Sequence, residues 1–85
     1  MTSRFNNRYE FSVYNKEKLQ YCGRFILRPS LSDIMERISS EQKTSNNKIT
    51  WKNLNISDIT CPDAGNYEFQ INDQPETYTI KLEYF

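Results

Sequence analysis

Apolar and polar residues alternate along four stretches of the chain, which is the period-two pattern of β-strands that bury one face. Residues 9–13 and 19–27 form the first pair of stretches, and a polar turn separates them. Residues 67–71 and 78–84 form the second pair, which an Asn/Asp/Pro segment joins. Each pair predicts a β-hairpin. In residues 19–27 the alternation predicts four inward side chains: Leu19, Tyr21, Phe25 and Leu27.

Helical spacing replaces this alternation between the two hairpins. Pro29 ends the second strand because it has no backbone N–H to donate to a sheet. Ser30 and Asp33 then have the spacing of a capping box. Apolar residues follow about one helical turn apart, at Leu31, Ile34, Met35 and Ile38. Together these signals predict an amphipathic helix over residues 31–42.

A polar loop follows this predicted helix and leads into an irregular strand. Residues 42–48 are polar, and residues 49–51 resume the alternation before its phase slips near Asn53. A slip of this kind predicts a bulge, or a corner where two strands meet. The local order of the predicted elements is therefore ββαβββ.

Length and charge restrict the classes of protein to which the chain can belong. Residues 1–85 suffice for one small domain, and the polar residues 1–7 are expected to be a disordered terminus. Eleven basic and eleven acidic residues cancel, which argues against nucleic acid as a partner. No apolar run approaches the roughly 18 residues of a membrane span, so no membrane partner is expected. Met1 without a following signal segment predicts a cytoplasmic or intracellular protein.

Residues that carry catalysis or bind metals are scarce. The chain has no histidine, and its two cysteines, Cys22 and Cys61, match no metal-ligand spacing. We therefore expect no enzyme, no catalytic residues, no cofactor and no metal site. Two free thiols in a reducing compartment are the expected state of the cysteines. A disulfide between them, which would imply secretion, is the alternative.

The second half of the chain carries a spaced motif. Residues 54–71 have the pattern Leu-x-Ile-x-x-Ile-x-x-x-Asp-Ala-Gly-x-Tyr-x-Phe-x-Ile, in which the last part contains Asp63, Gly65 and Tyr67. This pattern resembles the E strand, E–F corner and F strand of immunoglobulin domains of the I-set type. By the resemblance, Asp63 braces the corner, Gly65 permits its tight turn, and the Tyr67 hydroxyl bonds back to the corner backbone. The resemblance implies a mostly β fold, an immunoglobulin-like β-sandwich, with residues 77–85 as its last strand.

The chain departs from the immunoglobulin family at two positions. Its first half resembles a different family. Phe69 stands where the family has a cysteine, so the sandwich would lack the cross-sheet disulfide. Trp51 lies just before the motif, and the tryptophan of strand C is missing. In the immunoglobulin interpretation, residues 31–42 would form that strand C in place of a helix. Residues 9–42, with a hairpin followed by a helix, resemble a β-grasp (ubiquitin-like) domain. An α+β, β-grasp-like ββαβββ fold is therefore the alternative.

Both resemblances imply a non-enzymatic protein whose partner is another protein. An immunoglobulin-like chain would be an interaction or structural module, and the edge of strand 77–85 would pair with a partner's sheet or with a second copy in a homodimer. A β-grasp-like chain would be a small effector or inhibitor, of the kind that viruses encode, which binds and blocks a host protein. The candidate partner-binding residues are Trp51 and a basic face that contains Arg24, Arg28 and Arg37.

Overall fold

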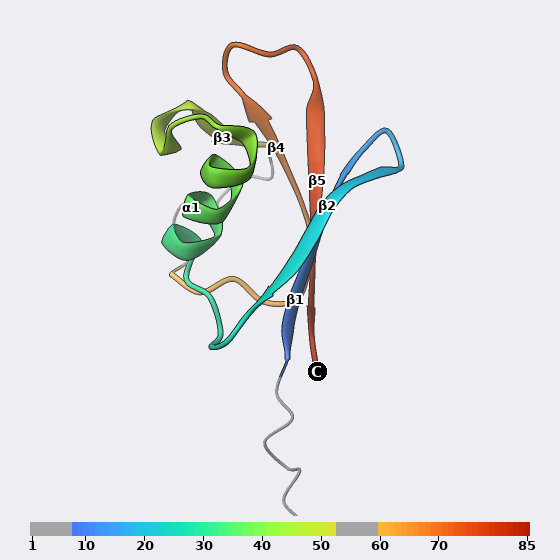
Figure 1. The fold of residues 1–85 in the computed structure, drawn as a ribbon, viewed down its shortest axis with the longest axis vertical. Helices are drawn as coiled ribbons and strands as arrows, with labels where there is room; N and C mark the ends of the chain where they lie inside the picture. Colours follow the sequence, from blue (N-terminus) through green and yellow to red (C-terminus); the bar gives the residue numbers. More distant parts are fainter. Residues whose placement is uncertain (1–7, 53–59) are drawn as a thin grey trace, which may run out of the picture.

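The computed structural model describes residues 8–52 and 60–85, which form one antiparallel sheet with an α-helix on one of its faces (Figure 1). The sheet has five strands in the order β2-β1-β5-β4-β3. In chain order the elements are β1 (Tyr9–Asn15), β2 (Lys18–Phe25), α1 (Leu31–Gln42), the short 3-10 helix η2 (Asn46–Lys48), β3 (Ile49–Trp51), β4 (Gly65–Ile71) and β5 (Thr77–Tyr84).

The β1–β2 hairpin closes through a two-residue turn and contains one irregularity. Lys16 and Glu17 both have positive φ, 53° and 68°, as the twist of a tight hairpin turn requires. The register between the strands then shifts between Val13 and Tyr14, so that Leu19 pairs with Tyr14. This β-bulge changes the phase of β2 and places Leu19 on the face opposite the core.

Two of the four inward positions predicted for this strand are therefore wrong. Leu19 is 51% exposed because of the bulge, and Leu27 is 77% exposed because β2 already ends at Phe25. Tyr21 and Phe25 do pack against the core, where both are partly buried. Alternation of apolar and polar residues in the sequence does not reveal a β-bulge. A bulge changes which residues pair across the two strands, and the sequence pattern along one strand stays the same.

The helix predicted over residues 31–42 is confirmed, with the same bounds. The Ser30 Oγ accepts the Asp33 backbone N–H at 3.1 Å, and the Asp33 carboxylate accepts the Ser30 backbone N–H at the same distance. The helix ends at Lys43, which adopts the left-handed conformation. Ile34 and Ile38 are buried against the sheet.

The core lies between α1 and one face of the sheet. Besides the two helix residues, it contains Phe11 and Val13 from β1, Ile49 from β3, Phe69 and Ile71 from β4, and Tyr78, Ile80 and Leu82 from β5. The other face carries the alternate, mostly polar residues of the same strands, as expected for an antiparallel sheet covered on one side.

The fold is mostly β, as predicted, and its described elements follow the order ββαβββ. The immunoglobulin-like sandwich is not confirmed, because every described strand belongs to one sheet and the residues expected to form strand C form α1. The predicted strand over residues 54–59 and the predicted terminus, residues 1–7, lie outside the described residues.

The prediction of a free edge at the last strand is wrong. β5 lies between β1 and β4 and pairs with both, so it is the central strand of the sheet. Pairing of this kind joins the two ends of the chain and is not encoded in the local pattern of apolar residues. In the described part of the sheet, the edges are β2 and β3.

Candidate protein-binding edge

The longer of the two sheet edges is β2. It has eight residues, of which all but the bulged Gln20 pair with β1, whereas the edge strand β3 has only three residues. An edge strand presents unpaired backbone N–H and C=O groups, to which another extended chain can hydrogen-bond. The described elements thus offer their longest run of such groups along β2.

The pairing of neighbouring strands indicates which β2 groups face outward. Arg8 and Phe85 exchange both backbone hydrogen bonds, at 3.2 and 2.8 Å, so this pair lies at a hydrogen-bonded position between β1 and β5. Since such positions alternate along an antiparallel strand, Phe11 directs its backbone groups toward β2, where its partner is Gly23. The residues on either side of Gly23, Cys22 and Arg24, therefore direct their backbone N–H and C=O groups away from β1, to the free edge.

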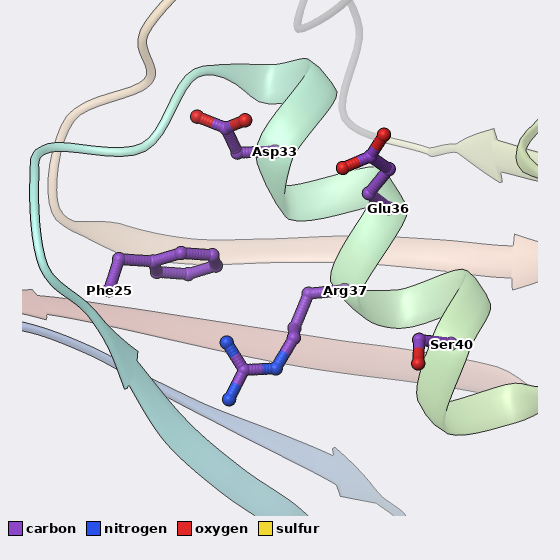
Figure 2. Close-up of a pocket in the computed structure, with 5 residues that line it drawn as sticks. All are labelled: Phe25, Asp33, Glu36, Arg37 and Ser40. Carbon is purple, nitrogen blue, oxygen red and sulfur yellow. The ribbon is translucent and has the colours of Figure 1, made fainter.

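A groove runs between this edge strand and α1. Its volume is about 360 Å³, and its lining residues come from the end of β2 and from the helix: Phe25, Asp33, Glu36, Arg37 and Ser40. Figure 2 shows the Arg37 side chain extending from the helix toward β2. The aromatic ring of Phe25 lies on the strand side of the groove.

Arg37 lies flat against the edge strand. Its guanidinium carbon is 5.0 Å from the centre of the Phe11 ring and 5.5 Å from that of Phe25, which are cation–π distances. Its Nη1 donates to the Arg24 carbonyl oxygen at 3.4 Å. A Cβ built on Gly23 would be only 2.8 Å from its Nη2. The missing side chain of Gly23 therefore leaves the space that the guanidinium occupies.

The carboxylates of the groove do not neutralise this guanidinium. Asp33 is engaged in the helix cap with Ser30. Glu36 directs its carboxylate away from β2 (Figure 2). The ion pairs among the described residues are Arg8–Glu10, Arg28–Asp63, Lys48–Asp73 and Lys81–Glu83, and Arg37 takes part in none of them. A guanidinium has five N–H donors, so Arg37 retains donors for a further acceptor.

A hydrogen bond also joins the last residue of the helix to the edge strand. Gln42 Nε2 donates to the Tyr21 hydroxyl at 3.1 Å. Burial raises the pKa of Tyr21 to about 12, and the bond from Gln42 opposes part of that rise. The Tyr21 side chain is thus neutral at ordinary pH, with its hydroxyl against Gln42 of α1.

The predicted corner residues lie together at a different place. The Tyr67 hydroxyl donates to the Asp63 carbonyl oxygen at 2.9 Å, backward along the chain as expected for a corner tyrosine. Gly65 has a φ of 151°, in the range that favours glycine. Tyr84 also holds this loop, through a 2.9 Å bond from its hydroxyl to the Pro62 carbonyl oxygen.

Arg28 belongs to this corner. Its Nη2 is 2.5 Å from the Asp63 carboxylate and 3.3 Å from the Cys61 carbonyl oxygen, and its guanidinium lies 5.6 Å from the centre of the Tyr84 ring. Asp63, the residue predicted to brace the corner, is thus the ion-pair partner of an arginine. The corner loop is held from β4, from β5 and from the segment that follows β2.

The four predicted partner-binding residues do not form one surface. Arg24 lies on β2 with its side chain on the open sheet face, beside Glu10 and Cys22. Arg37 belongs to α1 and its side chain packs on the opposite face of β2, while Arg28 lies at the corner. Trp51 is partly buried, with its ring 5.5 Å from that of Phe69, and its buried Nε1 has no hydrogen-bond partner among residues 8–52 and 60–85. The predicted continuous basic face is therefore wrong.

The roles of Gly23 and Phe25 in the groove were not predicted. A glycine inside a strand is a signal of close approach by another group, and this signal was available in the sequence. The group that approaches Gly23 is the side chain of Arg37, which lies 14 residues later in α1. Because the two residues are far apart in the sequence, the local pattern does not predict this contact.

Neither the cysteines nor the potential metal ligands of residues 8–52 and 60–85 form a cluster. Cys22 and Cys61 are both exposed and unpaired, and no cluster of three potential metal ligands occurs in this part of the chain. Its one α-helix is too short and too polar to cross a membrane. Comparisons with protein-family models, with curated proteins and with solved structures find no match to this chain.

Proposed function

We propose that this protein is a non-enzymatic protein-binding domain that receives an extended segment of its partner along β2. The single observation that carries the proposal is the eight-residue edge strand, whose Cys22 and Arg24 direct backbone hydrogen-bonding groups outward. Main-chain hydrogen bonds to such an edge provide affinity, and the side chains beside the edge provide specificity. The α1–β2 groove lies beside this edge and supplies those side chains.

The order of elements supports the α+β alternative over the sandwich. A hairpin is followed by a helix and then by three strands, which is the ββαβββ order expected for a β-grasp-like chain. The small effector or inhibitor remains the second candidate function, because the helix that motivated it is present. An inhibitor of this kind would use the same edge, and its binding would in addition block the activity of its partner.

Proline substitution tests the edge directly. In Cys22→Pro the outward N–H is removed, whereas the neighbouring bonds to β1 are kept, since proline is tolerated where a strand N–H faces solvent. Cys22→Ala is the matched control, because it removes the same thiol and keeps the N–H. Peptides selected for binding from a random displayed library are expected to bind the alanine variant and to lose at least tenfold in affinity for the proline variant.

The position of binding is read from the backbone amide signals in nuclear magnetic resonance spectra. Selected peptides are expected to shift the amides of Cys22 and Arg24 more than those of the central strand β5. Peptides that bind both variants equally, or that leave these two amides unchanged, would show that the β2 edge is not the binding site. Circular dichroism of both variants checks that each retains the fold.

A further inference from the structure

We infer that the segment received by β2 carries an aspartate or glutamate opposite Gly23, with apolar residues two positions before and after it, and that Arg37 binds this carboxylate. The inference rests on the proposed function and names the chemistry of its partner. It follows from the backbone direction of β2, from the position of Gly23 and from the ion-pairing state of Arg37.

The backbone of β2 determines the register of the incoming segment. Cys22 and Arg24 each offer an outward N–H and C=O, so an antiparallel segment would form hydrogen-bonded pairs with these two residues. The residue between those pairs lies opposite Gly23. Directly opposite residues in a sheet direct their side chains to the same face. This residue therefore directs its side chain to the face that α1 covers, toward Arg37.

The chemistry at that position favours a carboxylate. Gly23 contributes no side chain, and the space above it holds the Arg37 guanidinium, with Nη2 at 2.8 Å from the place of a Cβ. The guanidinium rests on the Phe11 and Phe25 rings and makes no ion pair with a described residue. Its planar array of donors matches the two oxygens of a carboxylate. Its bond to the Arg24 carbonyl is long, at 3.4 Å, and the incoming strand would replace it.

The flanking positions favour apolar side chains. The residues opposite Phe25 and Tyr21 lie two positions away from the one opposite Gly23, and they share its face. Phe25 is partly buried and lines the groove, and Tyr21 is partly buried against the core. An extended apolar–x–acidic–x–apolar segment therefore fits the edge.

A second copy of this chain does not supply that pattern. Its own edge strand, residues 18–25, contains Lys18 and Arg24 and no aspartate or glutamate. Antiparallel pairing of two β2 strands would therefore bring cations to the edge and would leave both Arg37 guanidinium groups without a carboxylate. Charge complementarity thus favours a different protein with an acidic extended segment over a homodimer through this edge.

The test compares two peptides on the full chain. The probe is acetyl-Thr-Val-Thr-Glu-Thr-Val-Thr-amide, and its matched control has glutamine in place of glutamate. Binding is measured from the amide shifts of Cys22 and Arg24 at low ionic strength. We expect the glutamate peptide to bind about tenfold more tightly, which corresponds to about 1.4 kcal/mol, and the difference to shrink as salt is added.

Variants of Arg37 and Arg24 test whether Arg37 causes the preference for the glutamate peptide. Arg37→Gln is expected to reduce the ratio of the two affinities to about one, and Arg37→Lys, which keeps the charge and loses the planar fork, to an intermediate value. Arg24→Gln also removes one positive charge, but from β2 and on the sheet face that α1 does not cover, so it is expected to keep the ratio. Arg37→Lys also covers the case in which Arg37→Gln fails to fold.

The outcomes separate the two proposals. Equal binding of the two peptides, or a tenfold preference that survives in Arg37→Gln, would overturn the inference about Arg37 while leaving β2 as a binding edge. Failure of both peptides to shift the Cys22 and Arg24 amides would overturn binding along β2 itself. Concentration-dependent self-association of the free chain that Cys22→Pro abolishes would replace the acidic partner with a second copy.

Discussion

The Arg37 guanidinium occupies the space that a side chain at position 23 would need: a Cβ on Gly23 would lie 2.8 Å from Nη2 of the arginine. The same Cβ would lie 2.9 Å from Cε1 of Phe11, whose ring supports the guanidinium. The absence of a side chain at Gly23 therefore allows helix α1 to place a charged group directly over the edge strand.

Gly23→Ala is expected to destabilise the fold by about 1 to 3 kcal/mol, because both Arg37 and the Phe11 ring must move. The arginine is flexible, whereas the ring belongs to the packed core, so most of the cost comes from Phe11. Urea unfolding measures the change. Cys22→Ala, on the same strand with its side chain exposed, is the control and should stay within about 0.5 kcal/mol. An unchanged unfolding midpoint in Gly23→Ala would contradict this contact.

Tyr67→Phe removes one hydrogen bond from the corner loop. The lost bond runs from the hydroxyl to the Asp63 carbonyl oxygen at 2.9 Å, and its removal should cost about 0.5 to 1.5 kcal/mol. Tyr14→Phe provides a control on the open sheet face, where it should have little effect. The measurement is the thermal unfolding midpoint. Equal midpoints for the Tyr67 variant and the native chain would show that the bond adds no stability.

Tyr21 makes the stability of the fold sensitive to alkaline pH. Its folded-state pKa is raised to about 12 from an ordinary value of 10.0, chiefly by burial. A raised pKa means that the folded state holds the proton more tightly, so this contribution is complete below pH 10 and is lost as the pH rises toward 12. Unfolding at a series of alkaline pH values should show this loss, and Tyr21→Phe should reduce it.

Absorbance provides a separate check on Tyr21. Tyrosinate absorption should include a late step in the folded protein that is missing from Tyr21→Phe. Tyr78 and Tyr84 also have pKa values raised by burial, so the comparison with the variant is what isolates Tyr21. A late step of unchanged size in the variant would assign it to another tyrosine.

Strand β5 should be indispensable for folding because it is the centre of the sheet. It pairs with both β1 and β4 and contributes Tyr78, Ile80 and Leu82 to the core. Removal of residues 77–85 is expected to leave an unfolded chain by circular dichroism. Ile80→Ala, the milder change, should cost about 2 to 5 kcal/mol in urea unfolding. A truncated chain that retains a cooperative unfolding transition would contradict the central position of β5.

The local elements of this fold could be predicted well. Capping residues and helical spacing lie within a few positions of one another, so residues 31–42 were recognisable as α1. Alternation likewise indicated β1, β4 and β5, since each buries one face. The bulge in β2, at the register shift between Val13 and Tyr14, leaves no such signal, and for this reason the alternation predicts the wrong face for Leu19.

The candidate site was only partly predictable. The sequence predicts Arg24 and Arg37 as partner-binding residues of one basic face, whereas their side chains lie on opposite faces of the sheet. Arg28 was placed with them and is paired with Asp63 at the corner instead. An arginine can form its ion pair with a carboxylate that is distant in the chain. The sequence pattern around each arginine therefore does not predict its partner.

The sequence by itself determined the elements, their order and the residues of the corner, because capping, alternation and turn chemistry act between near neighbours in the chain. Only the tertiary structure decided that β5 is central and that β2 is an edge, since pairing β1 with β5 joins residues about 70 positions apart. The groove depends on the same long-range order. Arg37 reaches the free backbone of β2 because α1 packs on the sheet beside Gly23, and no local signal specifies that contact.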